Sequence, residues 1–96
     1  MNFEQLKALK SHFVSKEVGD ELVLVPLTNN VVQMNELFTL NETGRFIWQN
    51  SDNVEDIDRM ATLMTDAFDI DRETAQKDIS NFLDRIATLF IKKRSL

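Results

Sequence analysis

Few side chains in this 96-residue sequence could carry out catalysis or hold a metal ion. The chain contains no cysteine and no tyrosine, and His12 is its single histidine. Disulfides, zinc–thiolate sites, cysteine nucleophiles and sites built from several imidazoles are therefore excluded. No carboxylate or cysteine lies close to His12 in the sequence, so we expect this residue to lie on the surface or to pack against its neighbours.

Three aspartates, Asp66, Asp69 and Asp71, resemble the start of a calcium-binding loop. An EF-hand also needs glycine at the sixth position of the loop and a bidentate glutamate at the twelfth, and the sequence has neither. A glycine-rich phosphate loop, a Walker lysine and a serine nucleophile elbow are also missing from the sequence. Because no nucleophile–base pair can be named, we expect a binding module without catalytic residues, metal or cofactor.

The residues best suited to binding lie near the C-terminus, where a helical segment has more apolar surface than one packed face requires. One stripe at helical spacing consists of Ile79, Leu83, Ile86 and Phe90. A second stripe, roughly 60° to 100° around the helix, alternates apolar and charged residues. It consists of Ala75, Asp78, Phe82, Arg85 and Leu89. This second stripe is either the margin of a wide core face or one wall of a groove that holds a partner.

The elements that position this segment begin with a short helix over residues 3–10, predicted from the spacing of its apolar residues. Gly19 and Asp20 then predict the turn of a β-hairpin, and a third strand is expected at about 36–40. Phe38 and Leu40 are assigned to the core face of that strand, because Leu40 leads directly into a helix cap. Leu37 and Thr39 alternate with them and face the other way.

Three helices are predicted after the third strand. Asn41 caps the first of them, the segment 50–53 ends that helix and caps the second, and Asp71 caps the third, which runs to about residue 90. The second helix has one apolar face, made of Val54, Ile57, Ala61, Met64 and Phe68. A hairpin and a strand followed by three helices predict a single α+β domain over residues 1–96.

The charge of the chain is acidic and unevenly distributed. Its net charge is −5, and residues 52–84 carry ten acids against three bases, or −7. Only the last twelve residues are basic, with a charge of +4. Nucleic-acid binders usually need a basic face, so we expect no nucleic-acid partner. No signal-peptide pattern or apolar run of about 20 residues is present, so we expect a cytoplasmic location and no membrane partner.

One motif makes the chain resemble a known family. The segment LNETGRFIW, residues 40–48, closely resembles the signature of the PqqD family, small proteins first named from pyrroloquinoline quinone (PQQ) biosynthesis. The segment GDELVLVPLTNNVVQMNELFTLNE is similar to the family's hairpin and third strand. The segment VEDIDRMATLMTDAFDIDRETAQKDISNFLDRI is similar to its second and third helices. The resemblance covers residues 13 to about 90, although the usual DG after the first helix is missing and the 29–36 loop is long.

This resemblance implies the fold also called the RiPP recognition element, a three-stranded antiparallel sheet on a three-helix bundle, similar to a winged helix. Such proteins bind the leader segment of a ribosomally made precursor peptide and present it to a modifying enzyme, often a radical S-adenosylmethionine enzyme. The leader adds as a strand beside the third strand and packs on the third helix. The peptide-binding residues implied here are Glu36, Leu37, Phe38, Thr39, Leu40, Ala75, Asp78, Phe82, Arg85 and Leu89.

The signature motif itself is expected to determine the fold and not to bind the ligand. Leu40 ends the strand in the core, and Gly44 lets the following helix approach the sheet at a cost of about 1 kcal/mol in helix propensity. Ile47 and Trp48 are expected to fill the space between the sheet and the helices.

Two other functions stay open from the sequence. A winged-helix domain that binds DNA or a regulator would need a basic recognition helix, whereas residues 71–84 carry four acids and two bases. A PqqD-like module could also dock to another protein without a peptide substrate.

Overall fold

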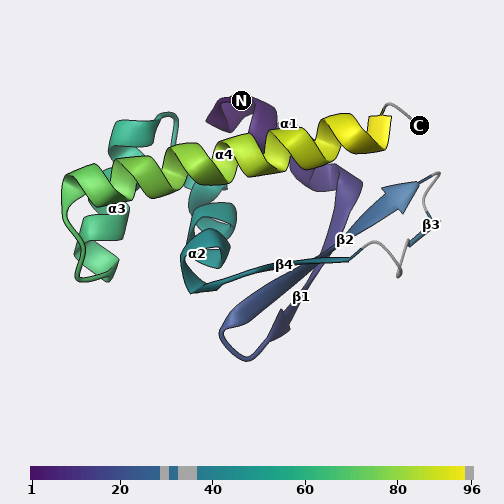
Figure 1. The fold of residues 1–96 in the computed structure, drawn as a ribbon, viewed down its shortest axis with the longest axis horizontal. Helices are drawn as coiled ribbons and strands as arrows, with labels where there is room; N and C mark the ends of the chain where they lie inside the picture. The colour runs from purple at the N-terminus through teal and green to yellow at the C-terminus, as the bar shows by residue number, and fades with distance from the viewer. Residues whose placement is uncertain (29–30, 33–36, 95–96) are drawn as a thin grey trace.

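The computed structural model of the protein describes residues 1–28, 31–32 and 37–94. Its helices and strands are α1 (Phe3–Leu9), β1 (Phe13–Val18), β2 (Glu21–Thr28), β3 (Val31–Val32), β4 (Phe38–Leu40), α2 (Glu42–Asn50), α3 (Ile57–Ala67) and α4 (Arg72–Arg94). Single turns of 3-10 helix follow α1 and α2. Figure 1 shows this order as a twisted sheet on one side and helices on the other.

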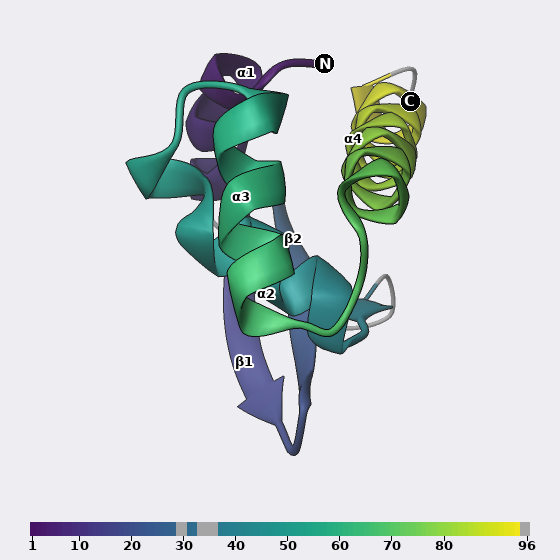
Figure 2. The ribbon, with the colours of Figure 1, turned by 90° about the vertical axis from the view of Figure 1, so that its left-hand side faces the viewer.

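The sheet is antiparallel, and β2 is its central strand. β1 pairs with β2 from Phe13 opposite Pro26 to Val18 opposite Glu21, and β4 pairs with the other edge of β2. The two-residue β3 pairs with the end of β2. Gly19 in the hairpin turn has a φ of 59°, a conformation that glycine adopts without steric cost. The tip of this hairpin extends beyond the end of α2 (Figures 1 and 2).

The helices form a layer on the inner face of the sheet. α4 is the longest, with 23 residues, and runs past α2, α3 and β4 in Figure 1. Figure 2 shows α4 on one side of the molecule and α1 and α3 on the other. None of the helices in the described ranges is both long and apolar enough to span a membrane.

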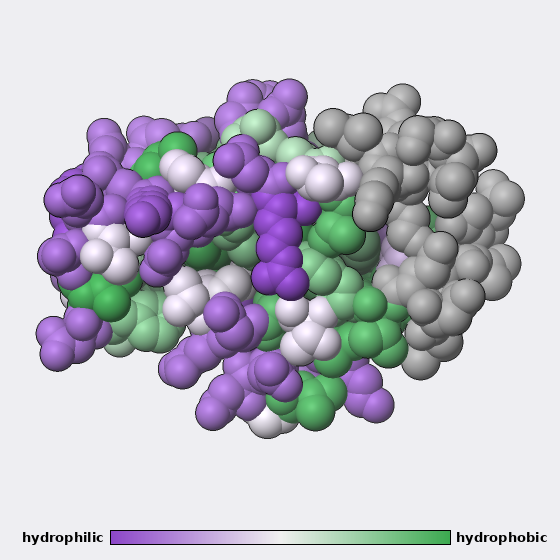
Figure 3. Space-filling model, in the orientation of Figure 1, coloured by the Kyte–Doolittle hydropathy of each residue, from purple (hydrophilic) through white to green (hydrophobic). Residues whose placement is uncertain are grey.

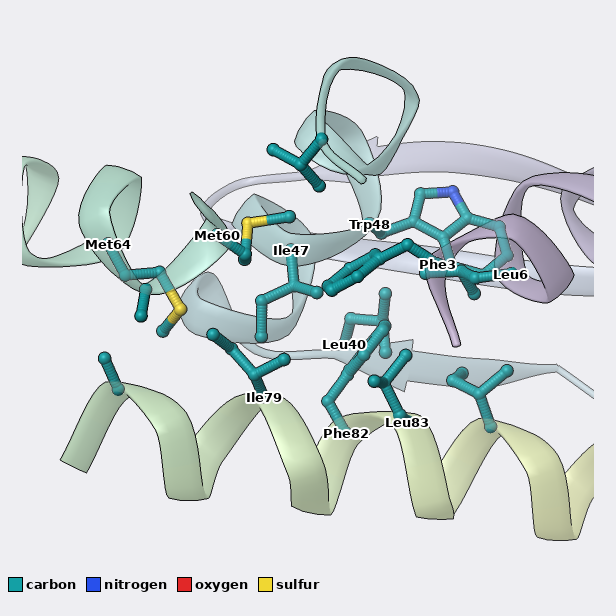
Figure 4. Packing of buried hydrophobic residues seen from close by; sticks show 14 of the residues in the cluster. Phe3, Leu6, Leu40, Ile47, Trp48, Met60, Met64, Ile79, Phe82 and Leu83 are labelled. Atoms are coloured by element: carbon teal, nitrogen blue, oxygen red, sulfur yellow. The ribbon is translucent and has the colours of Figure 1, made fainter. Parts of the chain in front are cut away.

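The hydrophobic core lies between α4, the other helices and the sheet, as Figure 4 shows. Every helix and both β2 and β4 contribute to it. Its fully buried side chains include Phe3, Leu6, Leu22, Leu24, Leu40, Ile47, Met60, Met64, Ile79 and Ile86. The three apolar residues of α1 are all buried, so this short helix is an integral part of the core.

The sequence-based prediction of the fold is confirmed, with two corrections. The predicted N-terminal helix is present and packs with the three helices that follow the sheet, so the described residues form four helices. Asp56 caps α3 by accepting a hydrogen bond from the N–H of Arg59, so the prediction that residues 50–53 cap this helix is wrong. Helix α4 continues past residue 90 to Arg94.

Candidate functional site

A groove lies between α4 and the junction of β4 with α2. Its volume is about 210 Å³. From the junction it is lined by Leu40, Asn41, Thr43, Gly44 and Ile47, and from α4 by Asp78, Asn81, Phe82 and Arg85. The groove therefore joins one end of a strand to the middle of the longest helix.

The floor of the groove depends on close packing between α2 and β4. The side chain of Asn41 caps α2 by accepting a hydrogen bond from the N–H of Gly44 at 2.9 Å. A Cβ atom at position 44 would lie 3.3 Å from the Cβ of Leu40, which is tighter than ordinary contact. Gly44 thus lets the helix approach the strand and leaves the groove hollow where a methyl group would otherwise stand.

The wall of the groove on α4 combines an apolar centre with two charged ends. Figure 4 shows Phe82 extending from α4 toward Leu40. Phe82 is 7% exposed, so most of its ring belongs to the core and one edge borders the groove. Asp78 lies one turn before it, half-buried, and Arg85 lies one turn after it, exposed.

The two charges of this wall are not committed to ion pairs. The guanidinium of Arg85 lies 4.8 Å from the centre of the Phe38 ring, a cation–π contact with the first residue of β4. Within the described part of the chain, neither Asp78 nor Arg85 has a hydrogen bond or ion pair through its side chain. In the same ranges, no three His, Asp or Glu side chains gather where they could hold a metal ion.

The strand beside this wall has an edge with which no described strand pairs. Among the described residues, β4 pairs with β2 alone, and β4 is the strand nearest α4 in Figure 4. Figure 3 shows hydrophobic surface below α4, in the area where Figure 1 draws β4 and β2. An extended chain placed along this edge would have main-chain partners on one side and the side chains of α4 on the other.

The structure brings together most of the residues predicted to bind a peptide. Phe38 and Leu40 pack on the core and Leu37 is exposed, in agreement with the predicted facing of the strand. Thr39 and Leu89 are half-buried.

Of two other predicted binding residues, one is covered by the core and one lies outside the described residues. Ala75 is fully buried in the core and offers no surface to a ligand. Glu36 lies outside the described residues, and the described strand begins at Phe38 and not at residue 36.

Sequence reasoning missed part of the lining. Asn81 was not considered, although it lies three residues after Asp78 and shares a helix face with Phe82 and Arg85. The sequence predicts a fold-determining role for Asn41 and Gly44, and in the structure both residues also border the groove. Ile47 and Trp48 were correctly predicted to be buried.

Comparisons with known proteins point to the same kind of molecule. The solved structure of TbiB1 in complex with the TbiA(beta) leader peptide is similar to this chain, with a TM-score of 0.65 and 26% sequence identity. The similarity covers 80% of this chain and 84% of TbiB1. No curated protein matches the sequence. Residues 21–89 match the family described as coenzyme PQQ synthesis protein D, and the chain therefore belongs to the PqqD family.

Proposed function

We propose that this protein binds the leader segment of a ribosomally made precursor peptide and presents it to a modifying enzyme. The observation that carries the proposal is the edge of β4 that pairs with no strand among the described residues, beside the groove on α4. Membership of the PqqD family supports it, as does the similarity to TbiB1, which was solved with a leader peptide.

The leader would bind by adding a strand to the sheet next to β4. Its main chain would pair with the free N–H and C=O groups of Phe38–Leu40, which supplies affinity that does not depend on sequence. Alternate side chains of an extended peptide point to opposite faces. One set would therefore enter the groove on α4, and the other would lie beside Leu37 and Thr39.

The groove suits peptide side chains better than a cofactor. Small-molecule sites commonly measure about 300 to 1,000 Å³, and this groove of about 210 Å³ is smaller and open on one side. Its apolar centre at Phe82 and Leu40 would hold one apolar side chain, and Asp78 and Arg85 would contact its neighbours. Leu89 would extend the same wall by one turn.

The protein would act as a peptide chaperone without catalytic residues of its own, over the single domain formed by residues 1–96. Its second partner would be the enzyme that modifies the precursor, and a radical S-adenosylmethionine enzyme is the class that the family resemblance favours.

Amide-shift mapping by NMR tests the proposal. The probe is a synthetic peptide that spans the leader of a short precursor encoded beside the gene of this protein. We expect shifts concentrated at residues 37–40 and 78–89, and weaker binding for Arg85→Glu. Arg59→Glu is the matched control, because Arg59 is also exposed and lies on α3, away from the groove. Shifts confined to β1 or α3 would overturn the proposal.

A further inference from the structure

The charges of the groove are ordered along its length. Asp78 and Arg85 are seven residues apart on α4, which corresponds to about 10.5 Å along a helix, and Phe82 lies between them. Both residues lie in the interior of a helix of 23 residues. Interaction with the helix dipole, which favours acids in the first turn and bases in the last, therefore does not explain their positions. They therefore form an acidic end, an apolar centre and a basic end.

The orientation of β4 determines which end of the strand each charged residue lies near. In Figure 1, α4 and β4 run in opposite directions, because β4 leads into α2 near the start of α4. Asp78 accordingly lies toward the end of β4 that meets Asn41, and Arg85 lies over Phe38 at the other end.

A peptide strand would most favourably pair antiparallel to β4, as all the described strands of this sheet do. Its N-terminal part would then pass Asp78, and its C-terminal part would pass Arg85. An extended chain advances about 3.4 Å per residue, so side chains on one face are about 6.8 Å apart at every second residue. Three such positions span about 13.6 Å, compared with about 10.5 Å between the two charged positions on α4. The side chain of Arg85 is long enough to bridge this difference.

We infer that the groove selects a peptide segment of a defined charge order: a basic residue, an apolar residue two positions later, and an acidic residue two positions after that. The inference rests on the proposed peptide-binding function and specifies the class of leader that would be bound. Asp78 would attract the basic side chain, the hollow at Gly44 and Phe82 would take the apolar one, and Arg85 would pair with the acidic one.

The distribution of charge along α4 supports this order of basic, apolar and acidic residues in the peptide. From residue 71 to residue 84 α4 and its cap carry four acids and two bases, and from Arg85 onward the sequence contains bases and no acid. The sequence around Asp78 is thus acidic and the sequence from Arg85 onward is basic, which would disfavour a segment with the reversed charge order.

Selection from a displayed library of random 12-residue peptides tests the inference. The library is selected on the wild-type protein, on Arg85→Glu and on the control Arg59→Glu, each confirmed as folded by circular dichroism. We expect the wild-type and control pools to be enriched in the basic–x–apolar–x–acidic pattern. In the Arg85→Glu pool, the acidic position should become basic while the first position keeps its preference.

Affinity measurements on one selected peptide complete the test. Changing its acidic residue to lysine should weaken binding to the wild type by up to about five-fold, the upper end of the range for a largely exposed ion pair, and should strengthen binding to Arg85→Glu. Pools of equal composition from wild type and Arg85→Glu, or the reversed charge order, would overturn the inference alone. If no peptide is enriched on the wild type, the peptide-binding function itself is refuted, and the inference with it.

Discussion

The two outer strands of the sheet, β1 and β4, differ in length and in what lies beside them. β1 has six residues, of which all but Phe13 are exposed, whereas β4 has three residues that are half-buried or buried. A peptide added to β1 would find a longer ladder of main-chain groups. A peptide added to β4 would find fewer of them but also the groove on α4, which gives the selectivity that main-chain hydrogen bonds lack.

The charged residues near the two strands differ in the same way. On the β1 side, Arg45 of α2 forms an ion pair with Glu17 and donates a hydrogen bond to the carbonyl of Gly19 at 2.9 Å. Gln49 also donates to Glu17 at 3.2 Å. These charges tie the hairpin to the helix and are already satisfied, whereas within the described residues the side chains of Asp78 and Arg85 beside β4 form no ion pair.

The exposed edge of β1 also carries a feature that discourages pairing with other chains. Lys16 lies between Val14 and Val18 on the face that points away from the helices, and charged residues of this kind are a common protection of edge strands. Lys16 thus disfavours pairing at the longer edge, and the shorter edge, on β4, is the one at which we propose that the peptide binds.

The largest effect is expected from Trp48, which lies on the β1 side of the core. Its ring meets that of Phe13 edge to face at 5.8 Å, and the ammonium of Lys10 lies 5.5 Å from its centre. Trp48→Ala should cost about 3–5 kcal/mol in unfolding free energy and lower the Tm by more than about 12 °C. Trp48→Phe should recover much of the loss. A Trp48→Ala protein that melts like the parent but no longer binds peptide would contradict the structural role.

The two glycines distinguish the two sides directly. Gly19→Ala should destabilise the protein by about 1 kcal/mol, because alanine disfavours the positive φ of the hairpin turn, and should leave peptide affinity unchanged. Gly44→Ala should leave the stability nearly unchanged, because a gain of about 1 kcal/mol in helix propensity offsets crowding against Leu40. It should lower the peptide affinity, because the added methyl group would enter the groove. Chemical unfolding and peptide titration of both variants measure this. Equal losses of affinity would argue against the groove.

A smaller effect is expected from the tie between hairpin and helix. Arg45→Lys keeps the charge but removes the planar fork that reaches both Glu17 and Gly19, so stability should fall by about 0.5–1 kcal/mol. Amide exchange at residues 19–21 should become faster, while exchange in β4 and peptide affinity stay the same. Faster exchange in β4 instead would show that the two edges are not independent.

Most of the fold could be predicted from the sequence because its local signals agree with one another. Asn41 and Asp71 are N-caps, and both accept the predicted hydrogen bonds, from the N–H groups of Gly44 and Thr74. The bond from Thr74 also holds the pKa of the Asp71 carboxyl below its usual value. The prediction did not include Asp56 as a cap because residues 50–53 are equally good cap formers, and in the structure Ser51–Asn53 form a 3-10 turn before the helix.

The groove could be predicted only in part, because its shape depends on contacts between distant segments. Helical spacing placed Asp78, Phe82 and Arg85 on one face, but it could not distinguish Ala75, which the core covers, from its neighbours. The contact between Arg85 and Phe38 joins residues 47 positions apart, and no local pattern indicates it.

The smallest effect on stability, and the most direct test of the two edges, comes from a pair of exposed apolar residues. Val14 in β1 is 44% exposed and Leu37, directly before β4, is 50% exposed. Val14→Lys and Leu37→Lys should each change the unfolding free energy by less than about 0.5 kcal/mol, as surface substitutions usually do.

Their effects on peptide binding should nevertheless differ. A strand added beside β4 would place a side chain next to Leu37, and such cross-strand pairs contribute roughly 0.2–1 kcal/mol, so Leu37→Lys should weaken binding up to about five-fold. Val14→Lys should leave the affinity unchanged, because β2 and β4 separate that residue from the proposed peptide. Titration of both variants with one peptide, at matched stability, measures the difference. Loss of affinity in Val14→Lys alone would show that the peptide binds at the edge of β1 and not at β4, because only a peptide paired with β1 would contact that side chain.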